Sequence, residues 1–429
     1  MGVSAVGLLA IGTAGLILDK NTHIWLEHHL TRLKTSIDPD TREWGWDLEA
    51  ERWTGDPNQG GTDAGLTADG RKAVRDAWFS HHRPEKYGSL DENNAGVNMV
   101  DALLLRTEAC LRSAIAIAED PNIVPKLHPC TLTDLLARRA GILERLGGAH
   151  IDESKVQYER VWQLLERKGV QAARVALKLG DVNSRLGNDK ALAWWTRAIE
   201  LVSGDKFGTQ LPTIPAAPPS GPAEQRLLAS ALVSISAFYA MRRQFDHARK
   251  IEEASLALLR SIRSPEALAS TSPPQTLHFL TLLHRSALLS SHLAEVMYVQ
   301  RLPVAECLKR LQAAATSSER VAYALVGISV RDSDQLTPSA KEPLLARYVD
   351  NPYLEKPASD LLRDARQSAA AAWNLMGELA ERMDRQSALQ YYTRAIGWAV
   401  ADSTLRDDFT LISRNYTRIK QALEPLESK

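Results

Sequence analysis

The sequence predicts an all-α protein, a solenoid of antiparallel helical hairpins preceded by one hydrophobic segment. Aromatic residues are only 6% of the 429 residues, and Ala, Leu, Arg and Glu, which helices accept at low cost, are abundant. From about residue 97 onward, apolar residues recur at intervals of three and four, which gives each predicted helix one wide apolar face. The peptide "ALAWWTRAI" at 191–199 returns as "ALQYYTRAI" at 388–396, so a whole helical hairpin is repeated.

Changes in composition divide the chain into five segments. They are a hydrophobic anchor at 1–18, a linker or collar at 19–95, helical hairpins at 96–210, a Pro-rich linker at 211–224 and further helical hairpins at 225–429. The linker or collar is set apart by four tryptophans beside a loop rich in Gly, Asp and Asn. The Pro-rich stretch "LPTIPAAPPSGP" is typical of a stiff connection between helical segments.

The first 18 residues carry no charge and predict a membrane anchor. As a helix they would reach about 27 Å, which is enough to cross the hydrocarbon core of a bilayer. Nothing basic precedes the apolar run, and a secretory signal peptide would normally begin with a basic segment. The alternative interpretation is a buried N-terminal helix. The sequence therefore predicts a single-pass protein whose helical array lies outside the membrane.

Small and aromatic residues recur at matching positions in successive hairpins. Eight of 23 ungapped positions are identical between the segments that begin at Leu177 and Asn374. A third copy surrounds Ser236, and a weaker fourth copy aligns Leu293 and Ala305 with the small positions. The residues predicted to pack the hairpins are Gly180, Ala191, Trp195, Ala198, Ser236, Tyr239, Ala248, Trp373, Gly377, Ala388, Tyr392 and Ala395. Small side chains let two antiparallel helices approach closely, and an aromatic side chain fills the seam to the next hairpin.

This spacing resembles the tetratricopeptide (TPR) repeat, a helix-turn-helix of 34 residues that stacks into solenoids. The resemblance implies a concave surface lined by the first helix of each hairpin, which suits an extended peptide or a partner helix. Lys178, Asn183 and Asn374 are polar residues of such helices and are candidates for that groove, or else ordinary solvated positions.

The sequence contains no motif that indicates catalysis or a cofactor. There is no phosphate loop, no nucleophile elbow, no HExxH and no GxGxxG, so we expect no enzyme, no cofactor and no small-molecule substrate. Three widely spaced cysteines give neither a disulfide framework nor a metal site. The 52 basic and 52 acidic residues balance, which disfavours nucleic acid as a partner.

A narrower resemblance rests on the N-terminal apolar segment, the collar with "WGWD" and "WTGDPNQGGTD", and phrases such as "RVALKLGDV" and "LVSISAFYAMRRQFDHARKIEEASLALLRSI". Together they resemble fungal membrane-anchored TPR proteins related to the adaptor subunit of the mitochondrial inner-membrane i-AAA protease. The resemblance implies an anchor in the inner mitochondrial membrane, an array in the intermembrane space, and presentation of unfolded clients to an AAA protease. A TPR co-chaperone or import receptor, or an assembly factor for a membrane complex, remains the alternative. No Arg-rich presequence precedes the apolar run, which departs from the family's expectation.

Overall fold

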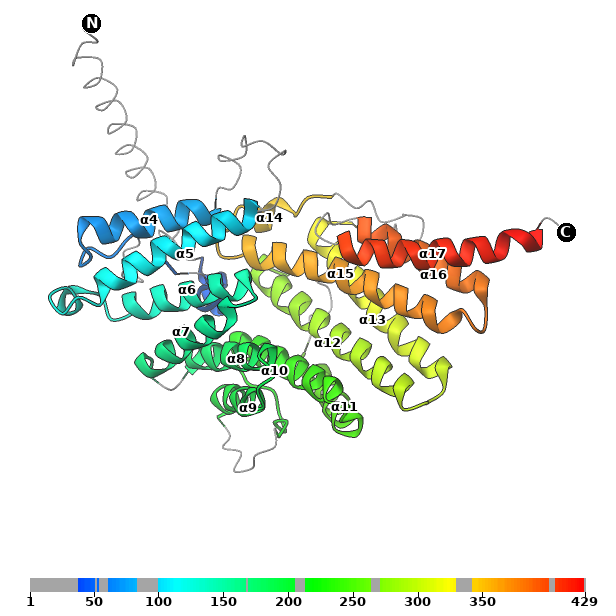
Figure 1. The fold of residues 1–429 in the computed structure, drawn as a ribbon. Helices are drawn as coiled ribbons and strands as arrows, with labels where there is room; N and C mark the ends of the chain where they lie inside the picture. Colours follow the sequence, from blue (N-terminus) through cyan, green and yellow to red (C-terminus); the bar gives the residue numbers. More distant parts are fainter. Residues whose placement is uncertain are drawn as a thin grey trace, which may run out of the picture. The chain divides into compact units, whose positions relative to one another are not determined.

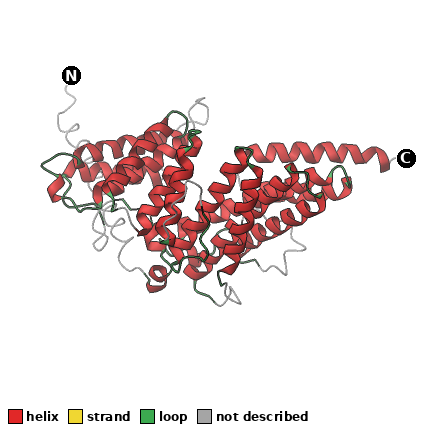
Figure 2. Cartoon of the chain, turned by 90° about the horizontal axis from the view of Figure 1, so that it is seen from below, coloured by secondary structure: helices red, strands yellow, loops and turns green. Residues whose placement is uncertain are grey.

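The computed structural model describes residues 38–50, 52–53, 61–82, 99–166, 169–204, 213–263, 271–328, 342–400 and 406–427. Figure 2 shows helices and connecting loops throughout these ranges and no strand, so the prediction of an all-helical fold is confirmed. The predicted anchor at 1–18 lies outside the described residues. No helix within the ranges given above combines the length and the apolar character that crossing a membrane requires.

The chain forms two compact units and passes between them several times, once inside helix α8 (Gly169–Arg185). Unit 1 comprises Ala50–Lys168 and Lys178–Ala191, and unit 2 comprises Pro39–Glu49, Gly169–Leu177 and Leu192–Lys429. Helix α8 contributes its beginning to unit 2 and its end to unit 1. A short N-terminal segment therefore belongs to the same unit as the C-terminal half of the chain.

Unit 1 is built from consecutive helices that pack against their neighbours in the chain. The helices are α4 (Ala68–His82), α5 (Met99–Ala118), the 3-10 helix η2 (Val124–Lys126), α6 (Thr131–Leu146) and α7 (His150–Leu164). Helix α4 packs on α5, α5 on α6, and α6 on α7. The α6–α7 turn begins at Gly147, where the chain takes a positive φ of 68° that glycine adopts without strain.

Unit 2 contains a row of hairpins followed by a single helix. Its helices are α2 (Pro39–Glu43), α3 (Trp46–Glu49), α9 (Lys190–Ser203), α10 (Pro222–Met241), α11 (Phe245–Ser261), α12 (Pro273–Val299), α13 (Val304–Val326), α14 (Ala346–Val349), α15 (Glu355–Ala380), α16 (Arg385–Val400) and α17 (Arg406–Glu427). Proline stands at the first position of α10 and α12, where no intrahelical N–H bond is lost. The pairs α10–α11, α12–α13 and α15–α16 are antiparallel hairpins (Figure 1). The first helices of these hairpins also contact one another, α10 with α12 and α12 with α15.

Three hairpin turns share one backbone geometry. In the α8–α9 turn, the N–H of Asn188 donates to the carbonyl of Asn183, and Gly187 takes φ 69°. The same bond joins Gln244 to Tyr239 in the α10–α11 turn and Leu302 to Met297 in the α12–α13 turn. The positive-φ residues in these two turns are Arg243 (58°) and Arg301 (62°). Each turn closes its first helix with a Schellman motif, which satisfies the last free carbonyls of the helix.

All twelve residues predicted to pack the hairpins are buried. At Gly377, an added Cβ would lie only 2.5 Å from the ring of Tyr392, so no larger residue fits there without displacement of the ring. Trp195 in α9 meets Phe238 in α10 edge to face, with ring centroids 5.6 Å apart, across the seam to the following hairpin. The prediction for Ala305 is wrong, because its side chain is exposed and Cys307, one half-turn later, fills the buried position.

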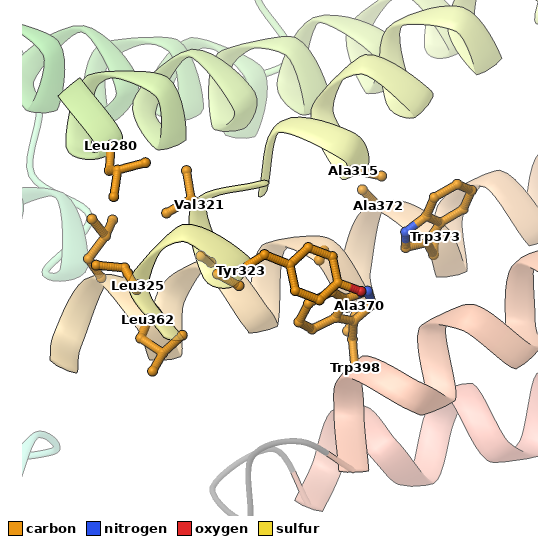
Figure 3. Packing of buried hydrophobic residues seen from close by; sticks show 14 of the residues in the cluster. Leu280, Ala315, Val321, Tyr323, Leu325, Leu362, Ala370, Ala372, Trp373 and Trp398 are labelled. Atoms are coloured by element: carbon orange, nitrogen blue, oxygen red, sulfur yellow. The ribbon is translucent and has the colours of Figure 1, made fainter. Parts of the chain in front are cut away.

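The largest core of unit 2 lies between α12, α13, α15 and α16 and includes Leu280, Val321, Tyr323, Trp373 and Trp398 (Figure 3). One carboxylate is buried beside it. Glu319 of α13 accepts hydrogen bonds from the indole N–H groups of Trp373 and Trp398, each at 2.7 Å. Because a buried indole N–H is stabilised by an acceptor, this carboxylate favours the burial of two tryptophans in one core.

Candidate peptide-binding site

Residues Pro39–Glu49, here called the strap, form α2 and α3 and lie on helices that begin much later in the chain. Helix α2 packs on α12, and α3 packs on α10. The strap site is the set of unit 2 residues that contact the strap: Gln171, Arg174, Ala223, Arg226, Pro274, His278, Phe279 and Asn351. These residues lie in the first two turns of α8, α10 and α12 or just before α15, so the strap crosses the beginnings of successive hairpins.

Trp46 is the anchor of the strap. Its side chain is only 2% exposed and belongs to the same core as Leu277, Leu280 and Tyr348. The indole N–H donates to the carbonyl of Pro274 at 2.9 Å, so the one polar group of the ring is satisfied. Truncation of a buried tryptophan to alanine typically costs about 3–5 kcal/mol. Trp46 therefore contributes much of the free energy that holds the strap.

Arg226 of α10 is the central residue of the strap site. Its guanidinium stacks on the Trp46 ring, with Cζ 3.8 Å from the ring centroid. Nε donates to Oε1 of Glu49 at 2.6 Å, and Nη2 donates to the carbonyls of Trp44 at 3.0 Å and Gly45 at 3.3 Å. Burial lowers the pKa of Arg226, while Glu49 opposes that change. A buried guanidinium needs an anion and several acceptors, and the strap supplies both.

His278 of α12 completes the hydrogen bonds of Arg226. Nη1 of Arg226 donates to Nδ1 of His278 at 3.0 Å, and since arginine is always a donor, Nδ1 is the acceptor. Nε2 then carries the proton and donates to Oε1 of Gln225 at 3.1 Å. Burial, and after it the positive charge of Arg226, lowers the pKa of His278 to about 3, so the ring is neutral at pH 7. The tautomer of the ring is thus fixed by its two partners.

The two ends of the strap are also held. Near its beginning, the amide Nδ2 of Asn351 donates to the hydroxyl of buried Thr41 at 3.1 Å. At its end, Gln171 donates to the carbonyl of Leu48 at 2.8 Å, and Arg174 donates to the carbonyls of Leu48 and Glu49. These two carbonyls end α3 and have no partner within that four-residue helix. Side chains of α8 therefore satisfy the main chain of α3.

Gly45 makes the bend between α2 and α3 and brings the strap close to α10. Its φ is 65°, a left-handed conformation that costs a residue with a side chain roughly 1–2 kcal/mol. An added Cβ would also lie 3.0 Å from Cβ of Ala223. Both the backbone conformation and the close approach thus favour glycine in the sequence "WGW".

The strap site is suited to binding a short acidic peptide. The strap carries Asp40, Glu43, Asp47 and Glu49 against one basic residue, Arg42, and it faces the guanidiniums of Arg174 and Arg226. It also lies at helix N-termini, which bear partial positive charge. Main-chain carbonyls, one carboxylate and one indole are recognised together, and these are the contacts by which grooves select peptides.

The three residues predicted for a partner-binding groove differ in their exposure. Asn183 is fully buried and donates to the carbonyl of Leu179 at 2.7 Å. Asn374 is buried beneath α17, where its carbonyl oxygen accepts from Asn415 at 3.2 Å. Lys178 alone is exposed, and its ammonium pairs with Glu144 at 3.2 Å. The side chains of Asn183 and Asn374 are therefore not accessible to a partner.

Residues 39–49 fall within the segment that the sequence predicts to be a linker or collar, whereas the structure packs them on unit 2. Two signals in the sequence indicate this packing. Exposure of tryptophan to water is unfavourable, so the sequence "EWGWDLE" indicates a packed segment rather than an exposed linker. Arg226 stands directly before the apolar run of α10 that begins at Leu227, and a charge that is buried beside such a run needs a partner.

No protein-family model matches the chain, and no curated protein is significantly similar to it in sequence. Within the part of the chain that the structure describes, no three His, Cys, Asp or Glu side chains come together as they would around a metal ion.

Proposed function

We propose that this chain is a non-enzymatic protein-binding scaffold whose hairpins are of the TPR type. Two observations support the proposal. The turns that end α8, α10 and α12 share one hydrogen-bond pattern, as units of a repeat do. Gly377 and Tyr392 form a tight small-to-aromatic contact within the last hairpin, at the spacing that the resemblance implies.

The strap site is the observation that carries the proposal. It holds a segment of the chain through its main chain, one acidic side chain and one buried indole. A scaffold of stacked hairpins functions by binding peptide segments in this way, through contacts that favour one bound conformation over the free chain. No bond is made or broken, so function consists of differential binding.

At a finer level, we propose a membrane-anchored adaptor in protein quality control at the mitochondrial inner membrane. The apolar run at 1–18, the tryptophan-rich segment and the repeated hairpins support it by their resemblance to adaptors of the i-AAA protease. In this proposal, extended or apolar segments of an unfolded client bind to one face of the array in the intermembrane space, while another face docks the AAA protease.

Affinity purification tests this proposal. The full-length tagged chain is purified from mitochondria of its own host in mild detergent, and co-eluting proteins are identified by mass spectrometry. We expect a membrane AAA protease together with short-lived inner-membrane proteins. An Ala388→Trp variant, which overpacks the last hairpin, is the control and should lose those partners. Recovery of cytosolic chaperones, or absence of the protein from mitochondria, would assign it to the co-chaperone or assembly-factor class.

A further inference from the structure

The strap is attached to unit 2 like a ligand rather than like a part of its fold. The chain that follows it, Ala50–Lys168, belongs to unit 1, and unit 2 resumes only at Gly169. The strap is thus held in unit 2 by side-chain packing and hydrogen bonds, with the whole of that intervening segment between it and the next residue of the unit. A short segment bound in this way is equivalent to a peptide bound in cis.

The chemistry of the strap site defines what can occupy it. Side chains of unit 2 donate hydrogen bonds to four main-chain carbonyls of the strap, those of Trp44, Gly45, Leu48 and Glu49. These bonds do not depend on which side chains the bound segment carries. Three features depend on sequence: a glycine at the bend, an indole that reaches the carbonyl of Pro274, and a carboxylate on Arg226 three residues after that indole. These features specify an acidic peptide with the pattern Gly-Trp-x-x-Glu.

We propose that the strap is an exchangeable ligand bound in cis, and that it occupies a peptide-binding site until a partner protein displaces it. The partner presents an acidic segment with a tryptophan three residues before a glutamate. Without an occupant, the buried guanidinium of Arg226 has neither its anion nor the indole on which it stacks. The site therefore rejects a neutral or basic segment and accepts only one that replaces both. This inference rests on the proposed function as a protein-binding scaffold.

The strap competes with any partner because it is tethered beside its own site. A tethered ligand has an effective concentration of roughly millimolar, so a free peptide of equal affinity gains little occupancy in the intact chain. Release of the strap should therefore raise the apparent affinity for the same peptide added in trans. This difference separates an exchangeable ligand from a permanent part of the core.

The test uses a fluorescently labelled peptide of residues 38–50 and the full-length chain in mild detergent, with fluorescence anisotropy as readout. The released variant, Trp46→Ala with Glu49→Gln, alters the strap and leaves every residue of the strap site unchanged. We expect it to bind the peptide at least about tenfold more tightly than the wild type does. Glu43→Gln, at an exposed strap position, is the matched control and should behave as the wild type does.

Two further arms make the result specific. A peptide with the same Trp46→Ala and Glu49→Gln changes should lose binding to the released variant, and Arg226→Met added to the released variant should abolish binding of the unaltered peptide. Equal binding of the altered peptide, or no gain over the wild type in a released variant with wild-type helix content, would overturn the inference. If the double variant does not reach that helix content, Glu49→Gln alone replaces it and should still gain severalfold.

The remaining outcomes are also decisive. If the wild-type chain is a dimer by light scattering and the peptide converts it to monomer, the occupant is the strap of a second copy, and the assignment to a partner protein is overturned. The affinity purification above reports partners bound by any face of the scaffold. Its failure would therefore count against the proposed function, whereas failure of the peptide assay alone counts against this inference.

Discussion

Glu319 shows how one buried charge can organise a core. Its two carboxylate oxygens accept from two indoles and from Arg394, whose Nε and Nη2 each lie at 2.7 Å. The guanidinium of Arg394 also stacks on Trp373, with Cζ 4.6 Å from the ring centroid. Because Arg394 belongs to the repeated sequence "TRAI", the pattern that marks the hairpin also supplies the partner of this acid.

Replacement of Glu319 by glutamine should destabilise unit 2. The glutamine side chain is neutral, and its N–H₂ group would face the indole and guanidinium N–H groups, which need an acceptor. We expect a loss of about 2–3 kcal/mol in the free energy of unfolding, measured by urea denaturation. Glu306→Gln, the same change at an exposed position of α13, should shift it by less than about 0.5 kcal/mol. Equal effects from the two variants would contradict the role given to Glu319.

Glu252 of α11 is a second buried acid, and it predicts a pH dependence. Ser236 donates to its Oε1 at 2.7 Å, while its Oε2 is buried with no hydrogen-bond partner among the described residues. Burial raises its pKa to about 7, against the opposing bond from Ser236, and the charges of Glu295 and Glu253 add to the rise. The folded chain therefore holds a proton between about pH 4.5 and 7 that the unfolded chain releases.

A folded pKa above the unfolded value gives stability at low pH that is lost as the pH rises. We expect the free energy of unfolding of the wild type, relative to Glu252→Gln, to fall by about 2–3 kcal/mol between pH 5 and pH 8. Burial lowers the pKa of His292, so its contribution to the free energy of unfolding rises with pH. Both proteins contain His292, so this contribution cancels when they are compared. Glu306→Gln, at an exposed position whose charge does not act on the pKa of Glu252, should follow the wild-type profile. A Glu252→Gln profile parallel to the wild type would contradict the prediction.

At the scale of the element, periodicity predicts the helices, and the twelve residues predicted to pack the hairpins are buried. Ala388 and Tyr392 could be placed from sequence because their neighbours, such as Gly377, lie in the same hairpin. The strap could not be placed in this way. Its helices have four and five residues, too few for a period to appear, and its stability comes from Arg226 and His278, which are far away in the chain.

The turns give an element-scale prediction. Arg243 and Arg301 hold the left-handed conformation that Gly187 holds in the equivalent turn. Glycine adopts this conformation without the steric cost borne by arginine, so Arg243→Gly and Arg301→Gly should each stabilise the protein by about 0.5–1 kcal/mol. Thermal unfolding followed by circular dichroism would show a higher midpoint for both variants.

A control lies one residue away. Arg242 has φ −79°, which any residue adopts, and its guanidinium lies 5.0 Å from the Phe238 ring centroid. Arg242→Gly should therefore lower the midpoint, because glycine adds freedom to the unfolded chain and removes that contact. Stabilisation by Arg242→Gly as well would show that loss of a surface charge, rather than relief of backbone strain, is responsible.

At the scale of the whole molecule, composition suggested a division of the helical array at the Pro-rich segment 211–224, whereas the compact units divide within α8 and near Ala191. Proline marks where a helix cannot continue, but a compact unit is defined by the contacts its helices make. Those contacts include the strap, which returns an N-terminal segment to unit 2, and no local signal reveals such a return.

Each unit has its own core, so we expect that a substitution can destabilise one unit and leave the other nearly unchanged. In unit 1, Asp63 accepts from the N–H groups of Gly65 and His128, both at 2.8 Å, and from the hydroxyl of Thr131. Burial alone would raise the pKa of Asp63, but these bonds together lower it below its ordinary value. Asp63→Ala removes all three bonds and should destabilise unit 1 by about 2–3 kcal/mol.

Hydrogen–deuterium exchange read peptide by peptide can assign this loss to one unit. Asp63→Ala should speed exchange in α4, α5 and α6 more than in α12, α13 and α15, and Glu319→Gln should show the reverse order, because local opening follows the stability of each core. Asp101→Ala, an exposed site on α5, should leave both sets near wild-type rates. If Asp63→Ala and Glu319→Gln instead accelerate both sets of helices equally, the two units unfold as one cooperative body through the helix that they share, and the division has no energetic meaning.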